Sequence, residues 1–115
     1  MNDRLTEAVE QLSRIPGVTG ALLVDAEAGL PVVGELADDA AAPAVAALAA
    51  AAYRRTGRAL DNAKLGRLEM FRLEAAGGNV LITDGGGLLI VVIAEPQAHH
   101  GRVQVEALQV AEALS

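Results

Sequence analysis

The segment Ile15-Pro16-Gly17-Val18 separates two hydrophobic patterns, and this boundary limits the possible folds more than any other feature of the chain. Before it, apolar residues recur at helical spacing between residues 5 and 12. After it come an unbroken apolar run over residues 20–24, a turn that contains Gly29, and a second apolar run over residues 30–36. A helix therefore ends abruptly and leads into a β-hairpin.

The remaining turns and apolar runs predict the order α-β-β-α-β-β-β-α. Asp38 or Asp39 is suited to cap the second helix, and Gly57 is its expected end or weak point. The predicted helices span residues 3–14, 40–56 and 100–114, and the predicted strands span residues 18–25, 31–36, 67–74, 80–84 and 88–95.

The turns between strands are short, so neighbouring strands are expected to be antiparallel. The last strand reads Leu-Leu-Ile-Val-Val-Ile-Ala over residues 88–94 without polar alternation, which indicates burial on both faces. This strand should be central, with helices on both sides of the sheet. A chain of 115 residues is one domain by size. The predicted fold class is therefore a single-domain α/β sandwich of the α+β type, over residues 1–115.

Charge is distributed unevenly along the chain, whose formal net charge is −6. Residues 1–39 hold eight acids and two bases, whereas residues 54–72 hold six bases and only two acids. An acidic chain is expected to repel nucleic acid. The basic segment is either a set of scattered exposed charges or a docking patch for an acidic partner.

Composition also limits the compartment and the chemistry. The chain has no cysteine, which excludes disulfides and thiol catalysis. No segment approaches the roughly eighteen apolar residues of a membrane span, and polar residues from Asn2 to Glu7 interrupt any signal peptide. We therefore expect a cytoplasmic protein that binds no membrane.

The second predicted helix has no charged residue between residues 40 and 53. At about 100° per residue, Val45, Leu48, Ala49 and Ala52 form one stripe, which is expected to face the core. The opposite, outer face consists of Ala47, Ala50, Ala51, Arg54 and Arg58. Either alanine is simply tolerated there, or the smooth face is built for close contact with another subunit or protein.

The strand predicted over residues 67–74 mixes apolar and charged side chains. Such a strand suits the edge of a sheet, where two copies of a chain can pair. Three of its residues, Leu68, Met70 and Arg72, therefore join the candidate dimer or partner interface.

Motifs for catalysis or metal binding are weak. The glycines at 85–87 open a strand and lack the Gly-Lys-Ser/Thr of a phosphate loop, so a hairpin turn is favoured. His99 and His100 are adjacent and have no third ligand nearby in sequence, which argues against a metal site. Asp25 and Asp84, like Asp61, fit local capping of turns better than acid–base chemistry.

The bases at 54–58 raise the alternative of an arginine finger, which stabilises charge on a transferring phosphoryl group. Bases near the end of a helix more often complement its dipole, and we favour that reading. We therefore expect no enzymatic activity, no metal and no cofactor.

Several of these features, taken together, cover nearly the whole chain. They are the boundary at residues 15–18, the Ala-Leu-Leu-Val-Asp strand at 21–25, the alanine-rich second helix, the Asp-Gly-Gly-Gly turn at 84–87, and His100-Gly101 at the last helix. In combination they resemble the roadblock/dynein light chain family, and its prokaryotic MglB-like members in particular.

The resemblance implies a roadblock, profilin-like sandwich with a five-stranded antiparallel sheet in the order 2-1-5-4-3. The second helix would lie on one face and the terminal helices on the other. It also implies a homodimer joined through the third strand and the second helix.

Prokaryotic members of the family regulate a Ras-like small GTPase. The resemblance thus implies a non-enzymatic regulator or scaffold that binds an MglA-like GTPase and reshapes it without donating a catalytic side chain. The alternative is a dynein-light-chain-like adaptor or a signalling-complex scaffold without GTPase regulation. A small-molecule sensor is disfavoured, because a closed, alanine-lined core with few aromatic residues offers little room for a ligand.

Overall fold

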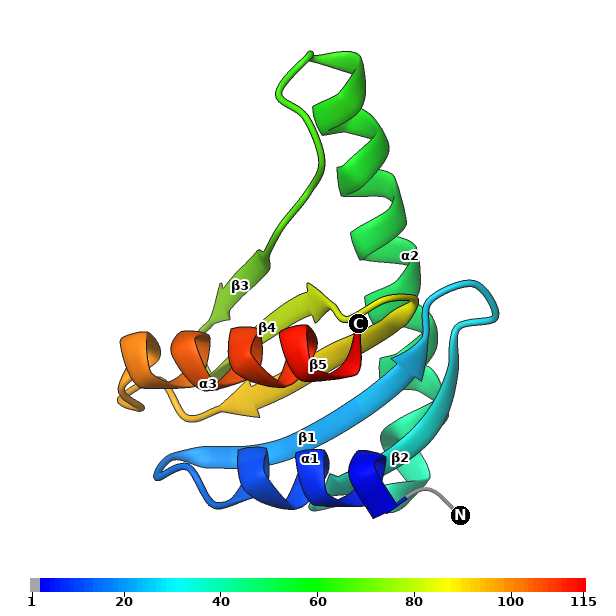
Figure 1. Ribbon diagram of the computed structural model, residues 1–115. Helices are drawn as coiled ribbons and strands as arrows, with labels where there is room; N and C mark the ends of the chain where they lie inside the picture. Colours follow the sequence, from blue (N-terminus) through cyan, green and yellow to red (C-terminus); the bar gives the residue numbers. More distant parts are fainter. Residues whose placement is uncertain (1–2) are drawn as a thin grey trace.

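The structure, a computed structural model, describes residues 3–115 (Figure 1). Its elements are α1 (Asp3–Ser13), β1 (Val18–Asp25), β2 (Leu30–Leu36), the short 3-10 helix η1 (Asp39–Ala41), α2 (Ala42–Asn62), β3 (Phe71–Ala75), β4 (Gly78–Asp84), β5 (Leu88–Ala94) and α3 (His100–Leu114). This order confirms the predicted one. Within residues 3–115, no helix is long and apolar enough to cross a membrane.

The five strands form one antiparallel sheet in the order β2-β1-β5-β4-β3, which confirms the predicted topology. β5 is central and pairs with β1 and β4. Its residues 89–92 are buried, as the absence of alternation predicts. β2 and β3 form the two edges, and a β-bulge interrupts the β1–β2 register beside Leu23 and Val24.

Helices cover the two faces of the sheet unequally (Figure 1). α1 and α3 lie together on one face, whereas α2 alone lies on the other. Because side chains alternate along β1, Leu23 packs under α1 and α3, while Leu22 and Val24 pack under α2. Burial of each such side chain contributes roughly 1.5–3 kcal/mol.

The boundary at residues 15–18 has a structural role. Gly17 has a φ of +91°, and a Cβ added there would lie 2.6 Å from the Cβ of Ala98. Only glycine fits this conformation and this close approach. The Gly17 carbonyl also accepts a 2.8 Å hydrogen bond from the amide of Glu95. The turn after α1 is thereby fixed against the segment between β5 and α3.

One predicted boundary of the second helix is wrong. α2 does not end near Thr56 but continues through Gly57 to Asn62. An interior glycine costs only about 1 kcal/mol relative to alanine, and the neighbouring residues, which include Arg58 and Leu60, are good helix formers.

The predicted start of the third strand is also wrong. β3 begins at Phe71, not at Arg67. Residues 65–70 lead from the end of α2 to β3 and are not part of the ladder. Backbone carbonyls in this segment bond to side chains instead: the Thr83 hydroxyl donates to the Glu69 carbonyl at 3.0 Å.

Candidate partner interface

α2 packs on the sheet through a face that differs from the predicted one. Its buried residues are Ala46, Ala49 and Ala50, and Tyr53 packs beside them. Ala50 is only 2% exposed, so its predicted place on the outer face is wrong. Leu48 is 70% exposed, so its predicted place in the core stripe is wrong as well.

The cause is a close approach between α2 and the turn that joins β1 to β2. A Cβ added to Gly29 would lie 3.6 Å from the Cα of Ala47 and 3.6 Å from the Cβ of Ala50. At this separation only small side chains fit beneath the helix, and the larger Leu48 is turned outward. The remaining predicted outer residues, Ala47, Ala51, Arg54 and Arg58, do lie at the surface of α2, Ala51 being half-buried.

α2 covers only part of its side of the sheet, because it packs on β2 and β1. On the same face, Phe71 and Val80 pack at the margin of the α2 core. Leu73 pairs with Val80, which in turn pairs with Ile93, so these three side chains share that face. Leu73 is 50% exposed, and Val80 and Ile93 are half-buried.

The side of α2 that adjoins this bare region is also apolar. Arg54 marks the opposite side, because its guanidinium donates a 3.4 Å hydrogen bond to the carbonyl of Ala26 in the β1–β2 turn. Val45, Leu48 and Ala52 lie about 120–180° around the helix from Arg54. Val45 and Ala52 are half-buried on this side of the helix, whereas Leu48, on the same stripe as Arg55, is turned toward solvent. We call the resulting surface the open apolar face: Val45, Leu48, Ala52, Leu73, Val80 and Ile93.

The end of α2 extends beyond the sheet, and the chain returns beside it toward β3 (Figure 1). We call residues 54–70 the arm. Its two sides are joined by Tyr53, whose hydroxyl donates a 2.9 Å hydrogen bond to the carbonyl of Leu68. At the tip, Lys64 has a φ of +62° and Leu65 is 73% exposed. The arm therefore carries little core of its own.

Tyr53 is half-buried at the base of the arm. Burial raises the pKa of its phenol above the ordinary value, and the carboxylates of Asp84 and Glu69 raise it further. The guanidinium of Arg67 opposes this effect. Tyr53 therefore remains a neutral hydrogen-bond donor to the arm at physiological pH.

A polar hollow of about 470 Å³ lies at the base of the arm. Its lining includes Tyr53, Arg67, Glu69, Asp84 and Leu108. The hydroxyl groups of Tyr53 and Thr83 both bond to backbone carbonyls of the arm. The polar groups of this hollow therefore hold the arm in position and do not form a catalytic arrangement.

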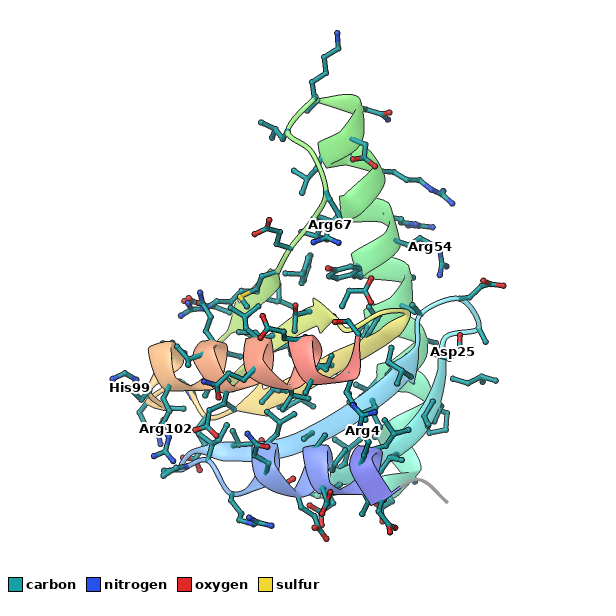
Figure 2. All side chains as sticks on the ribbon, in the orientation of Figure 1. Arg4, Asp25, Arg54, Arg67, His99 and Arg102 are labelled. Atoms are coloured by element: carbon teal, nitrogen blue, oxygen red, sulfur yellow. The ribbon has the colours of Figure 1, made fainter. Side chains whose placement is uncertain are left out.

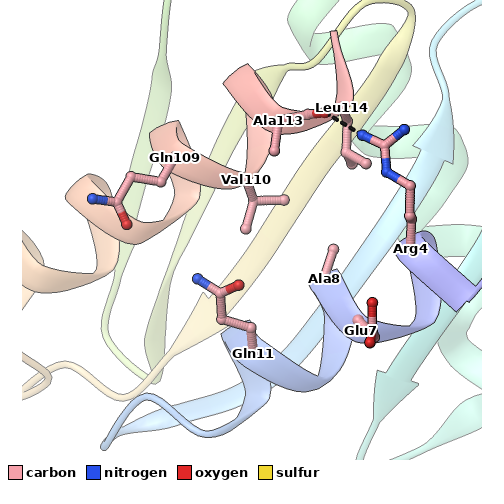
Figure 3. A pocket seen from close by; sticks show the side chains of 8 residues that line it. All are labelled: Arg4, Glu7, Ala8, Gln11, Gln109, Val110, Ala113 and Leu114. Carbon is pink, nitrogen blue, oxygen red and sulfur yellow. Dashed lines mark hydrogen bonds between the residues drawn. The ribbon is translucent and has the colours of Figure 1, made fainter.

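A second hollow, of about 260 Å³, separates α1 from α3 (Figure 3). Arg4 reaches across one end of it and donates a hydrogen bond to the carbonyl of Ala113, near the C-terminus of α3. Such a cation is favourable at a helix C-terminus. Ala8 and Val110 lie in the middle of the groove, and Gln11 and Gln109 lie toward the end away from Arg4 (Figure 3). The Arg4 hydrogen bond connects the two helices across the groove, and the residues that line the groove include no catalytic pair.

The predicted edge residues do not all face the same way. Leu68 is half-buried within the arm, where its Cβ would lie 3.9 Å from a Cβ added to Gly57. Met70 packs instead against the core under α1 and α3. Arg72 lies in β3 and forms a 3.3 Å ion pair with Glu74. The structure thus places these residues near one edge, on different faces.

The turns and histidines have local structural roles. Asp25 accepts hydrogen bonds from the amides of Glu27 and Ala28, and Asp84 accepts one from the amide of Gly87. These contacts confirm the capping role predicted for the two aspartates. Nδ1 of His99 caps α3 by accepting a 3.0 Å bond from an amide. Among residues 3–115, no group of three or more histidine, aspartate or glutamate residues is placed to hold a metal.

Sequence patterns missed the most exposed members of the open apolar face. Leu48 falls on the same predicted stripe as the buried Ala49, and Leu73 falls in a strand that mixes apolar and charged residues. The signal available was size: among the alanines of α2, Leu48 is one of few large side chains. Its exposure could be recognised only once the approach of α2 to Gly29 was known.

Comparison with known proteins agrees with this architecture. The family model of the Roadblock/LC7 domain matches residues 5–94. A protein of Methanocaldococcus jannaschii is 28% identical over 102 residues, which cover 89% of this chain and 86% of the relative. The structure of the gliding protein MglB from Thermus thermophilus has a TM-score of 0.86 and 21% identity, covering 97% of this chain and 86% of its own.

MglB of Myxococcus xanthus is similar in the same way, with a TM-score of 0.87 and 17% identity over 97% of this chain and 85% of its own. At these identities the structural likeness shows a shared fold. The family model spans most of the sequence, from α1 to the end of β5. The chain therefore belongs to the Roadblock/LC7 domain family and has the fold of its prokaryotic MglB members.

Proposed function

We propose that this protein is a non-enzymatic homodimer that binds a Ras-like, MglA-like small GTPase and modulates its GTPase cycle. The observation that carries the proposal is the open apolar face beside the free edge of β3. Leu48 and Leu73 are 70% and 50% exposed. Large apolar side chains exposed beside a free strand edge support an interaction site there.

The proposed dimer pairs β3 with the same strand of a second copy about a two-fold axis. Such an interface is isologous, so the same patch is used twice. Strand pairing would satisfy the outer backbone groups of β3, and the second α2 would cover Leu73 and Val80. Leu48 and Leu73 take the place of Ala50 in the candidate interface. Ala47, Ala51, Arg54, Arg58, Leu68, Met70 and Arg72 remain candidates.

The GTPase part of the proposal rests on family membership. The resemblance to prokaryotic MglB-like members implies a Ras-like GTPase as the partner, and the fold is that of MglB. We propose that the dimer acts by reshaping the GTPase, in the cytoplasm, and supplies no catalytic side chain.

Two measurements test the proposal. Light scattering should give twice the 11.8 kDa chain mass at micromolar concentration. A monomer there would refute the dimer. The Ras-like GTPases of the source organism, loaded with GDP or a non-hydrolysable GTP analogue, should then be tested for binding. Preference for one nucleotide state supports the regulator. A dimer that binds neither state favours the adaptor or scaffold.

A further inference from the structure

The arm differs in charge from the rest of the protein. It contains Arg54, Arg55, Arg58, Lys64 and Arg67 but only two acids, Asp61 and Glu69, a formal charge of +3. Because the whole chain carries −6, the remaining residues carry −9. The molecule is thus an acidic body with one basic projection. Figure 1 shows the projection, and Figure 2 labels two of its arginines, Arg54 and Arg67.

These five bases are not neutralised within the protein. The ion pairs formed within residues 3–115 are Arg14–Glu10, Arg72–Glu74 and Arg102–Glu106, and none of them includes an arm base. All five bases are exposed. Unpaired like charges on a short segment repel one another, which a partner of opposite charge would relieve.

Arg55 and Arg58 offer the most direct contact. They lie three residues apart, so they are neighbours on one side of α2. That side also carries Ala51 and points away from the buried alanines Ala46 and Ala50. The two guanidinium groups therefore project from a smooth helical surface, where each can bind a carboxylate in a bidentate manner.

The shape of the molecule limits the kind of acidic partner. Arg54, at the base of the arm, bonds to the carbonyl of Ala26, which lies between Asp25 and Glu27. A broad anionic surface, such as a lipid bilayer or a long nucleic acid, would approach these carboxylates as well as the arm. A folded protein with a limited acidic patch can contact the arm alone.

We propose that the arm is the docking surface for an acidic patch of a protein partner, with Arg55 and Arg58 as its main contacts. This inference rests on the proposed function, in which the partner is the small GTPase, and it specifies the chemistry of the GTPase surface that binds. Complementary charge of this kind accelerates association and makes it dependent on salt.

The test compares two double variants that change the net charge equally. Arg55→Glu with Arg58→Glu reverses the arm, and Arg14→Glu with Arg102→Glu reverses two exposed bases of the body. Association with the GTPase of the source organism, loaded with either nucleotide, is measured by surface plasmon resonance at 50 and 300 mM NaCl. Circular dichroism and light scattering verify that each variant is folded and has the wild-type oligomeric state.

We expect the arm variant to associate at least about tenfold more slowly than wild type at low salt, and the body variant to associate no more slowly. Wild-type association should also slow at 300 mM NaCl. Binding that is insensitive to salt and equal in all three proteins would overturn the inference while leaving the proposed function intact. No binding by wild type at either salt concentration would reject the proposed function and the inference with it. Binding of wild type to phosphatidylserine vesicles or to DNA through the same arginines, with no GTPase binding, would also overturn the inference.

Discussion

The hydroxyl of Tyr53 on α2 donates a 2.9 Å hydrogen bond to the carbonyl of Leu68, fifteen residues further along the chain. This bond joins the helix to the returning segment at the base of the arm. Few apolar contacts support the arm beyond this point, since Leu65 at its tip is 73% exposed. The returning segment of the arm is therefore held by two hydroxyl groups, that of Tyr53 at Leu68 and that of Thr83 at Glu69.

Replacement of Tyr53 by phenylalanine should loosen the arm. The variant keeps the ring but removes the donor, and the loss of one such bond costs about 1 kcal/mol. Hydrogen exchange of residues 63–70 should become faster. Thr19→Val is the matched control, because it removes a 3.3 Å hydroxyl bond to Ile93 outside the arm. Equal exchange in wild type and Tyr53→Phe would contradict the assigned role.

Alkaline titration should show a raised pKa for Tyr53. The chain has one tyrosine and no tryptophan, so absorbance at 295 nm reports this phenol alone. Because burial raises its pKa in the folded state, it should ionise above the ordinary value of about 10. The stability linked to Tyr53 is complete below pH 10 and is lost as pH rises through the folded-state pKa. The same midpoint in guanidinium chloride and in buffer would disprove the shift.

Two glycine substitutions should have opposite effects on stability. Gly57 lies inside α2, and its nearest non-local neighbour to an added Cβ is Leu68 at 3.9 Å, an ordinary contact. Gly57→Ala should therefore stabilise the protein by about 0.5–1 kcal/mol. Gly17→Ala should destabilise it, because the new Cβ would lie 2.6 Å from Ala98 at a φ of +91°. Urea unfolding measures both, and destabilisation by Gly57→Ala would argue against a continuous α2.

Glutamate substitutions at two nearby positions of α2 should show which position is in the core and which is at the surface. Ala50→Glu buries a carboxylate in the core under α2, and its cost should prevent stable folding. Ala47→Glu places the same group at the surface, so the monomer should remain folded while dimer or partner binding weakens. Circular dichroism and light scattering distinguish the two. If the Ala47→Glu variant were unfolded, Ala47 would belong to the core, and its assignment to the surface would be wrong.

Much of the fold could be predicted from the sequence because its main signals are local. The change of periodicity at residues 15–18, the glycine turns and the non-alternating β5 each act over a few residues. The boundaries that failed depend on long-range contacts. Thr83 holds the carbonyl of Glu69 and keeps that segment out of the ladder, and no local pattern at 67–70 reveals this.

The candidate interface was harder to predict for a related reason. In an alanine-rich helix every side has similar hydrophobicity, so periodicity does not fix which side faces the sheet. The rotation is set by Gly29, which lets Ala50 approach the β1–β2 turn. Leu48 is exposed as a result, although its own hydrophobicity favours burial.

The two edges of the sheet differ in how readily a strand of another copy can be added to them. β2 contains Pro31, which has no amide to donate, the adjacent register bulge, and the charged Glu35. These features make β2 a poor template for a further strand. In the proposed dimer, the sheet would be complete once the second β3 has been added. The difference between the two edges would then also protect the protein from assembling into open-ended fibres.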